Sequence, residues 1–169
     1  MPGLGTPWGT PTRIEYNEGA EIGYRWYAKT NATPLFPFGY GLGYTTFALS
    51  DLAVNGGDTV TATFTVTNTG SRAGANVPQL YLTDAVGEKR IRLLGFERVD
   101  LRPGEKREVT LKADPRLIAR FDASAKAWRI TGGTYRIAVG ENAADLELTA
   151  GANDVIKRVL KPRVLWAIQ

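Results

Sequence analysis

The chain has 169 residues, of which 43% are hydrophobic, so it can bury the core of one domain with room for an attachment. Because it contains neither cysteine nor histidine, it excludes disulfides, thiolate chemistry, serine triads and the common zinc sites, and carboxylate chemistry remains. The formal net charge of +4 comes from a final basic group, and the other charges balance, so we expect no nucleic-acid partner. No stretch approaches eighteen consecutive apolar residues, so we expect no membrane partner either.

The N-terminal part is rich in aromatic residues but has no folding pattern of its own. Nine of the chain's 17 aromatic residues lie within residues 1–44. This stretch shows no strand alternation and no helical period long enough to fold alone. We therefore expect residues 1–33 to be the end of another, upstream domain.

Residues 34–47 read PLFPFGYGLGYTTF and form the most unusual stretch of the chain. Glycine and proline at this density predict irregular backbone, whereas the aromatic content predicts burial against other groups. We interpret the segment as a connector clamped between two packed bodies. Gly39, Gly41 and Gly43 are expected to let the backbone turn where a side chain would clash.

After the connector, the sequence predicts an all-β domain. Residues 59–67 read TVTATFTVT, which is the strict alternation of a half-buried strand. Seven short strands are expected in all, at 47–54, 59–67, 77–83, 91–99, 107–113, 133–139 and 145–149, and a helical turn or two is expected at 114–121. Short strands separated by glycine and proline turns predict a seven-strand antiparallel sandwich of immunoglobulin or fibronectin type III kind over residues 48–150.

The sequence leaves two alternatives for each of two features of this domain. Tyr135 in the penultimate strand is either a tyrosine-corner residue or a plain core residue. Residues 151–169 are expected to be a basic tail, either solvated or a strap onto a partner, and carry the final basic group of Lys157, Arg158, Lys161 and Arg163.

The acidic residues do not form a convincing active site. Glu15, Glu18 and Glu21 recur at a spacing of three, which would place them on one helix face as candidate glycosidase carboxylates. Glycine at positions 19 and 23 argues against that helix, and ion pairs with nearby arginines explain the glutamates better.

The candidates for metal, phosphate and sugar sites also have structural explanations. Asp100, Asp114 and Asp122 lack the tight spacing of a calcium loop, so turn chemistry explains them better. The glycines of the connector lack the lysine of a phosphate loop. Trp128 and Trp166 are candidates for stacking on a sugar, although core packing is the commoner role. We expect no metal site and no cofactor.

Four signatures, kept in chain order, carry a resemblance to a known family. They are Glu18-Gly19-x-x-x-Gly23-Tyr24-Arg25-Trp26-Tyr27, then PLFPFGYGLGYTTF, then the predicted sandwich, and within it Leu94-Gly95-Phe96-Glu97-Arg98-Val99 with Leu101-x-Pro103-Gly104. From about Tyr16 to Leu148, the chain resembles the C-terminal portion of glycoside hydrolase family 3 enzymes of the β-glucosidase type.

This resemblance implies a larger parent protein. Such enzymes carry a barrel domain with the nucleophile, an α/β domain with the acid/base, and a fibronectin type III-like domain, and they release terminal β-D-glucosyl residues with retention. Both catalytic carboxylates would then lie upstream of residue 1, so no catalytic residue is assigned here. Residues 1–33 would close the α/β domain, and a periplasmic or secreted location is favoured by the resemblance alone.

Three functions follow as hypotheses. The first is a structural, non-catalytic C-terminal domain whose upstream contacts are made by Glu18, Tyr24, Arg25, Trp26, Phe36, Phe38, Tyr40 and Tyr44. The second is a free-standing carbohydrate-binding or adhesion module. The third is a fragment that complements a separate chain carrying the catalytic domains of a two-chain glycosidase.

Overall fold

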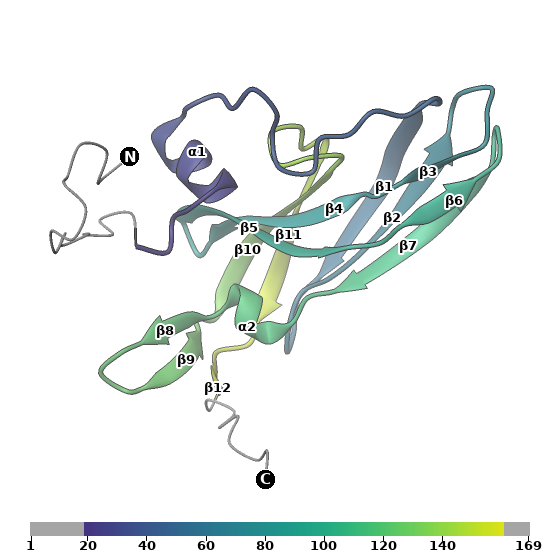
Figure 1. Cartoon of the computed structure of the whole chain (residues 1–169). Coiled ribbons are helices and arrows are strands. Elements are labelled where there is room, and N and C mark those ends of the chain that lie inside the picture. The colour runs from purple at the N-terminus through teal and green to yellow at the C-terminus, as the bar shows by residue number, and fades with distance from the viewer. Residues whose placement is uncertain (1–18, 161–169) are drawn as a thin grey trace, which may run out of the picture.

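The computed structural model describes residues 19–160, which form a sandwich of two antiparallel sheets (Figure 1). One sheet has the order β1-β2-β7, with β1 at Phe47–Asn55, β2 at Thr61–Asn68 and β7 at Lys106–Lys112. The other has the order β11-β10-β4-β5, with β4 at Gln79–Ala85, β5 at Glu88–Phe96, β10 at Gly133–Gly140 and β11 at Leu148–Val155. The all-β sandwich expected from the sequence is confirmed.

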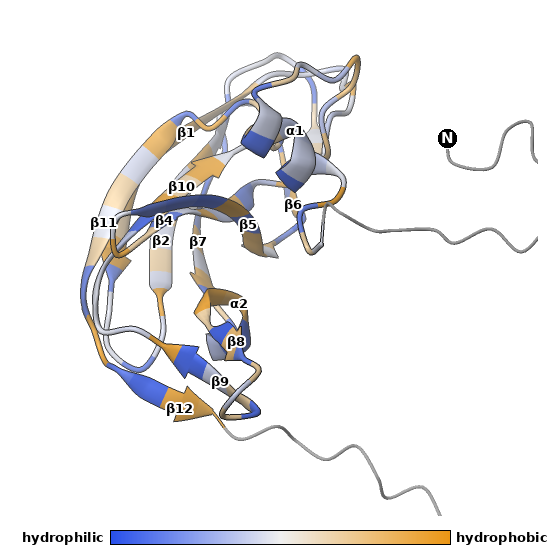
Figure 2. Ribbon diagram, turned by 90° about the vertical axis from the view of Figure 1, so that its left-hand side faces the viewer, coloured by the Kyte–Doolittle hydropathy of each residue, from blue (hydrophilic) through white to orange (hydrophobic). Residues whose placement is uncertain are grey.

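Shorter elements complete the described part of the chain. Two small sheets pair β3 (Gly74–Asn76) with β6 (Val99–Leu101), and order β12 (Arg158–Leu160), β9 (Ala127–Ile130) and β8 (Arg120–Asp122). The helices are α1 at Tyr24–Thr30 and α2 at Pro115–Ile118. In both Figure 1 and Figure 2, α1 and the β8–β9–β12 sheet lie at opposite ends of the sandwich.

The core follows from the alternation of β2. Val60, Ala62, Phe64 and Val66 are fully buried, while the threonines between them are only partly covered. These apolar side chains meet those of the opposite sheet, such as Leu80, Leu82, Ile137 and Val139, in one cluster. Period-two alternation therefore predicted which face of β2 would be buried.

Strand β4 departs from alternation because both of its faces are covered. Leu80 and Leu82 belong to the core cluster, and Tyr81 between them is buried as well. Tyr81 faces the ring of Tyr24 on α1, with the ring centroids 5.9 Å apart. The N-terminal helix thus covers the outer face of the larger sheet at this point.

Tyr135 has the geometry of a tyrosine corner. It is buried on β10, and its hydroxyl donates to the carbonyl oxygen of Thr131, four residues earlier, over 2.7 Å. This hydrogen bond from a tyrosine to upstream backbone is the defining contact of the motif. The tyrosine-corner interpretation is confirmed.

Two helix predictions had different outcomes. The turn expected at 114–121 is α2, and Asp114 caps it by accepting from the Arg116 backbone N–H. In contrast, the sequence did not predict α1, which follows Gly23 and ends at Asn31 in the left-handed conformation. Its seven residues are too few to be stable in isolation, where roughly 12–15 are needed.

The predicted strands also differ from the structure near the C-terminal end and in the short elements. The strand expected at 145–149 begins later, at Leu148, because Asn142 forms a turn in which its side chain accepts from the backbone N–H groups of Ala144 and Asp145. Pairing continues past residue 150, through the end of β11 and through β12. The short strands β3, β6, β8, β9 and β12 were not predicted.

Candidate interaction surface

An unusually apolar surface lies over α1 and the irregular segment that follows it. Eight large hydrophobic side chains are exposed there, with Phe36 66% and Tyr44 92% accessible. We call them the aromatic surface: Trp26, Tyr27, Leu35, Phe36, Phe38, Tyr40, Leu42 and Tyr44. A contiguous exposed patch of this kind marks an interaction site.

Tyr24 anchors α1 beneath this surface. Its hydroxyl oxygen accepts a hydrogen bond from the Leu93 backbone N–H over 2.9 Å, which ties the helix to β5. Its ring packs against Phe38, with centroids 5.1 Å apart, and against Tyr81. One tyrosine therefore joins the helix, the connector and the sheet.

Gly39 anchors the middle of the connector. Its φ of +88° favours glycine, and a Cβ at this position would overlap the side chain of Gln79. Gln79 is held by the Tyr81 hydroxyl, which donates to its Oε1 over 2.5 Å. The prediction that a glycine is required for a turn and close approach is confirmed at this position.

The other two connector glycines do not have that role. A Cβ at Gly41 would have no atom within 4 Å, and a Cβ at Gly43 would only approach the Thr45 carbonyl oxygen at 3.5 Å. Neither residue has a positive φ. The expected clash is therefore wrong for Gly41 and Gly43.

Asn68 holds the C-terminal end of the connector. Its side-chain oxygen accepts from the Thr45 hydroxyl over 2.8 Å and from the Gly70 backbone N–H over 3.0 Å. Its amide donates to the carbonyl oxygens of Arg72 and Leu101. Asn68 is fully buried, so this network fixes where β1 begins. Sequence reasoning placed Asn68 in a turn but did not identify its structural role.

A groove of about 370 Å³ runs between α1 and the connector. Its walls include Tyr24, Tyr27, Phe36 and Phe38, and Ala143 closes one end. The Ala143 backbone N–H donates to the Phe38 carbonyl oxygen over 2.9 Å, so the loop before β11 supports the groove from below.

Charged side chains lie beneath α1. Burial lowers the pKa of Arg92 on β5, and the nearby guanidinium of Arg25 lowers it further. Both cations are partly buried rather than spread on the surface. The apolar patch is therefore bordered on the β5 side by positive charge.

The predicted contact residues divide into three groups. Glu18 lies outside the described residues. Tyr24 and Arg25 face the sheet, whereas Trp26, Phe36, Phe38, Tyr40 and Tyr44 belong to the aromatic surface. Within residues 19–160, the connector aromatics are exposed, so the expectation that they are buried is not met in this part of the chain. Leu35 and Leu42 are equally exposed but were missed.

The candidate chemical residues occupy structural positions. Asp114 caps α2, Asp122 accepts from Ser124, Ala125 and Arg129 around a tight turn, and Asp100 pairs with Arg98 over 2.7 Å. The predicted turn chemistry is thus confirmed for Asp114 and Asp122, whereas Asp100 lies within β6 and forms an ion pair instead. Within residues 19–160, no group of three or more acidic side chains is arranged to hold a metal ion.

Of the remaining candidate residues, some lie in the described part of the chain and others lie outside it. Glu21 precedes α1 and is not on its face, while Glu15, Glu18 and Trp166 lie outside the described residues. Trp128 on β9 packs against the core cluster and against Phe121, with ring centroids 5.3 Å apart. In the part of the chain that the structure describes, no helix has the length and apolarity to span a membrane.

The sequence and the structure are both similar to those of known proteins. Residues 76–143 match the family described as Fibronectin type III-like domain. The structure superimposes on β-glucosidase 3B from Thermotoga neapolitana with a TM-score of 0.79 and 35% identity, covering 87% of this chain and 21% of that one. It also matches the glycoside hydrolase family 3 β-glucosidase of Bifidobacterium adolescentis, with a TM-score of 0.75 and 34% identity over 82% of this chain and 21% of the other.

The chain is a fibronectin type III-like portion of a glycoside hydrolase family 3 protein. Among curated sequences, it is 38% identical over 148 residues to thermostable β-glucosidase B of Acetivibrio thermocellus, covering 83% of this chain and 20% of that protein. The resemblance predicted from the sequence is confirmed. This family 3 portion spans about a fifth of the length of the relatives it matches.

Proposed function

We propose that the chain is the structural, non-catalytic part of a family 3 β-glucosidase and that its aromatic surface packs against the catalytic domains. The observation that carries the proposal is the two-sided character of residues 24–44. Tyr24 and Gly39 fix this segment to the sandwich, while Phe36 and Tyr44 project outward without cover. Burial of such side chains is favourable by roughly 25 cal/mol per Å² of apolar surface.

In this proposal, the domain boundaries follow the sequence prediction. Residues 1–33 belong to the end of the upstream α/β domain, residues 34–47 connect it to the sandwich, and the sandwich begins at residue 48. Because Tyr24 ties α1 to β5, the end of the upstream domain would in this proposal lie directly against the sandwich.

The chemistry of the parent would be supplied by its other domains. A retaining glycosidase requires two carboxyl groups about 5 Å apart across the scissile bond. The aspartates singled out in this chain are committed to turns and to ion pairs with arginine. The chain would therefore position the catalytic domains and would not take part in bond cleavage.

Hydrolysis of an aryl β-glucoside tests this proposal. The purified chain should show no turnover, whereas turnover should occur when the catalytic domains are present in the same polypeptide or as a co-expressed chain. In that active protein, Phe36→Ser with Tyr44→Ser should lower thermal stability, because both substitutions place a polar group in the proposed contact. Phe121→Ser is the matched control, since Phe121 is also half-exposed but lies on β8, away from the aromatic surface.

Other outcomes would favour the rival hypotheses. Turnover by the chain alone, abolished by replacing one of its own carboxylates, would refute a non-catalytic role. Activity restored only by adding the chain to a separate catalytic chain would identify a two-chain enzyme. Saturable binding to insoluble glucan that is lost on replacing Trp128 or Trp166 would instead indicate a carbohydrate-binding module.

A further inference from the structure

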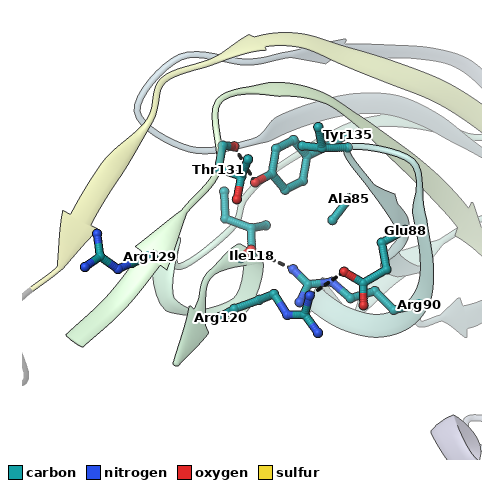
Figure 3. Close-up of a pocket in the computed structure, with 9 residues that line it drawn as sticks. Ala85, Glu88, Arg90, Ile118, Arg120, Arg129, Thr131 and Tyr135 are labelled. Atoms are coloured by element: carbon teal, nitrogen blue, oxygen red, sulfur yellow. Dashed lines mark hydrogen bonds and ion pairs between the residues drawn. The ribbon is translucent and has the colours of Figure 1, made fainter. Parts of the chain in front are cut away.

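A second cavity, separate from the aromatic surface, lies beside the small β8–β9–β12 sheet (Figure 3). Its volume is about 210 Å³, and its walls come from the β4–β5 hairpin, the end of α2, β8, β9 and β10. The charged residues in its lining are Glu88, Arg90, Arg120 and Arg129. Three cations and one anion thus line the same space.

Arg90 is the unusual member of this set. One of its terminal nitrogens donates to the Ile118 carbonyl oxygen over 2.7 Å, which satisfies the end of α2. Its Nε is buried and has no hydrogen-bond partner, and within residues 19–160 the guanidinium forms no ion pair. A buried donor without a partner is rare and costly in folded proteins.

The other cations are balanced. Arg120 pairs with Glu88 over 2.5 Å, and Arg129 pairs with Asp122 over 2.7 Å at the edge of the cavity. In Figure 3, the guanidinium groups of Arg90 and Arg120 lie close together, whereas that of Arg129 points away. Glu88 therefore forms an ion pair with Arg120 but not with Arg90. Burial lowers the pKa of Arg90, and the nearby charge of Arg120 lowers it further.

The rest of the lining restricts the kind of anion. Ala85, Val86 and Ile118 add apolar groups to the lining of the cavity. Inorganic phosphate has no apolar part to place there, whereas an organic carboxylate has one. A carboxylate also presents two oxygens, each of which can accept a charge-assisted hydrogen bond from a guanidinium N–H group.

We propose that this cavity binds a small organic carboxylate, whose two oxygens accept from Arg90 and Arg120 and whose apolar body lies against Val86 and Ile118. The ligand supplies the second negative charge that the cavity lacks. This site is independent of the aromatic surface and of the proposed catalytic partner.

Nuclear magnetic resonance of the full 169-residue chain tests the site directly. Sodium benzoate is the probe, neutral benzamide is its isosteric control, and inorganic phosphate is the competing anion. Benzoate should shift the Nε–H resonance of Arg90 saturably, with affinity in the millimolar range, and benzamide and phosphate should not. The proposal is overturned by the absence of a saturable benzoate shift, or by an equal response to phosphate.

Substitutions separate binding from a merely structural role. Arg90→Lys keeps the positive charge but removes the planar guanidinium group and its N–H donors. It should therefore weaken benzoate binding about tenfold. Glu88→Gln removes the competing anion and should strengthen binding about two- to fivefold. Arg92→Lys is the matched control, because Arg92 lies on the same strand and is also partly buried but does not line the cavity. Equal effects of Arg90→Lys and Arg92→Lys would contradict the proposal.

A glutamate or aspartate of a protein partner presents the same carboxylate group. Calorimetric titration with benzoate of the active protein that includes the catalytic domains distinguishes this source. Retained binding assigns the cavity to a free ligand, as proposed. Loss of binding there, with binding intact in the 169-residue chain, would overturn the free-ligand assignment in favour of a side chain from the partner.

Discussion

At the scale of single residues, the connector depends on one buried amide and one glycine. Asn68 makes four hydrogen bonds through its side chain and is inaccessible to solvent. Asn76 is almost as buried, but its side chain makes a single hydrogen bond, to Glu141 over 2.9 Å. The pair allows the value of the Asn68 network to be measured against a control of the same residue type.

Asn68→Ala should lower the free energy of unfolding by about 2–4 kcal/mol, because it removes buried hydrogen bonds to the Leu101 carbonyl oxygen and from the Gly70 N–H. Asn76→Ala should cost about 1 kcal/mol. Urea unfolding followed by tryptophan fluorescence measures both. Equal costs would show that the connector network adds nothing beyond burial of an amide.

Gly39→Ala should release the connector from the sheet. The substitution combines an unfavourable φ, which costs about 1–3 kcal/mol, with overlap against Gln79. Chymotrypsin should therefore cleave after Phe38 and Tyr40 faster than in the unmodified chain. Gly41→Ala is the control, since its Cβ meets open space. If both variants are cleaved at the same rate, Gly39 does not anchor the segment.

At the scale of elements, α1 is held by its first residue. Tyr24 contributes the hydrogen bond from Leu93 and both ring contacts, and the helix has no buried residue of its own. Helix propensity alone cannot sustain seven residues. The helix should therefore open independently of the sandwich when this contact is weakened.

Tyr24→Phe tests this dependence with a single atom removed. It should cost about 1 kcal/mol, and exchange of the Leu93 amide hydrogen should become about fivefold faster. Hydrogen exchange followed by nuclear magnetic resonance gives the rate. Tyr27→Phe is the control, because the described hydrogen bonds include none from the Tyr27 hydroxyl. Unchanged exchange at Leu93 in Tyr24→Phe would contradict the role of this bond.

The elements that the sequence predicted are those whose pattern is set locally. The alternation of β2 and the proline at the start of α2 were sufficient to place both. In contrast, α1 and the β8–β9 hairpin are short, and they are stabilised by contacts with residues distant in the chain, such as Tyr24 with Leu93. Such long-range contacts do not produce a periodic pattern of apolar residues in the sequence.

The same distinction applies to the two candidate sites. The aromatic surface was predictable because PLFPFGYGLGYTTF is too apolar for an ordinary loop. The arginine cavity was not, since Arg90 on β5 and Arg120 on β8 look like ordinary strand cations until the fold brings their two strands together. Asn68 was missed for a similar reason, because its four partners come from three parts of the chain.

At the scale of the whole molecule, the aromatic surface and the low net charge bear on association. A formal charge of +4 on 169 residues gives weak repulsion between copies, and the exposed apolar side chains gather at one end, over α1 and the connector. Without its proposed partner, such a surface favours contact with another copy of the chain.

The isolated chain should therefore self-associate with rising concentration, as measured by sedimentation equilibrium. Phe36→Ser with Tyr44→Ser should weaken this association, and Phe121→Ser on β8 should not, although all three side chains are at least half-exposed. Because the contact is apolar, sodium sulfate should strengthen it more than sodium chloride of equal ionic strength. An equal effect of the β8 substitution would place the contact elsewhere and remove the main support for packing against a catalytic domain.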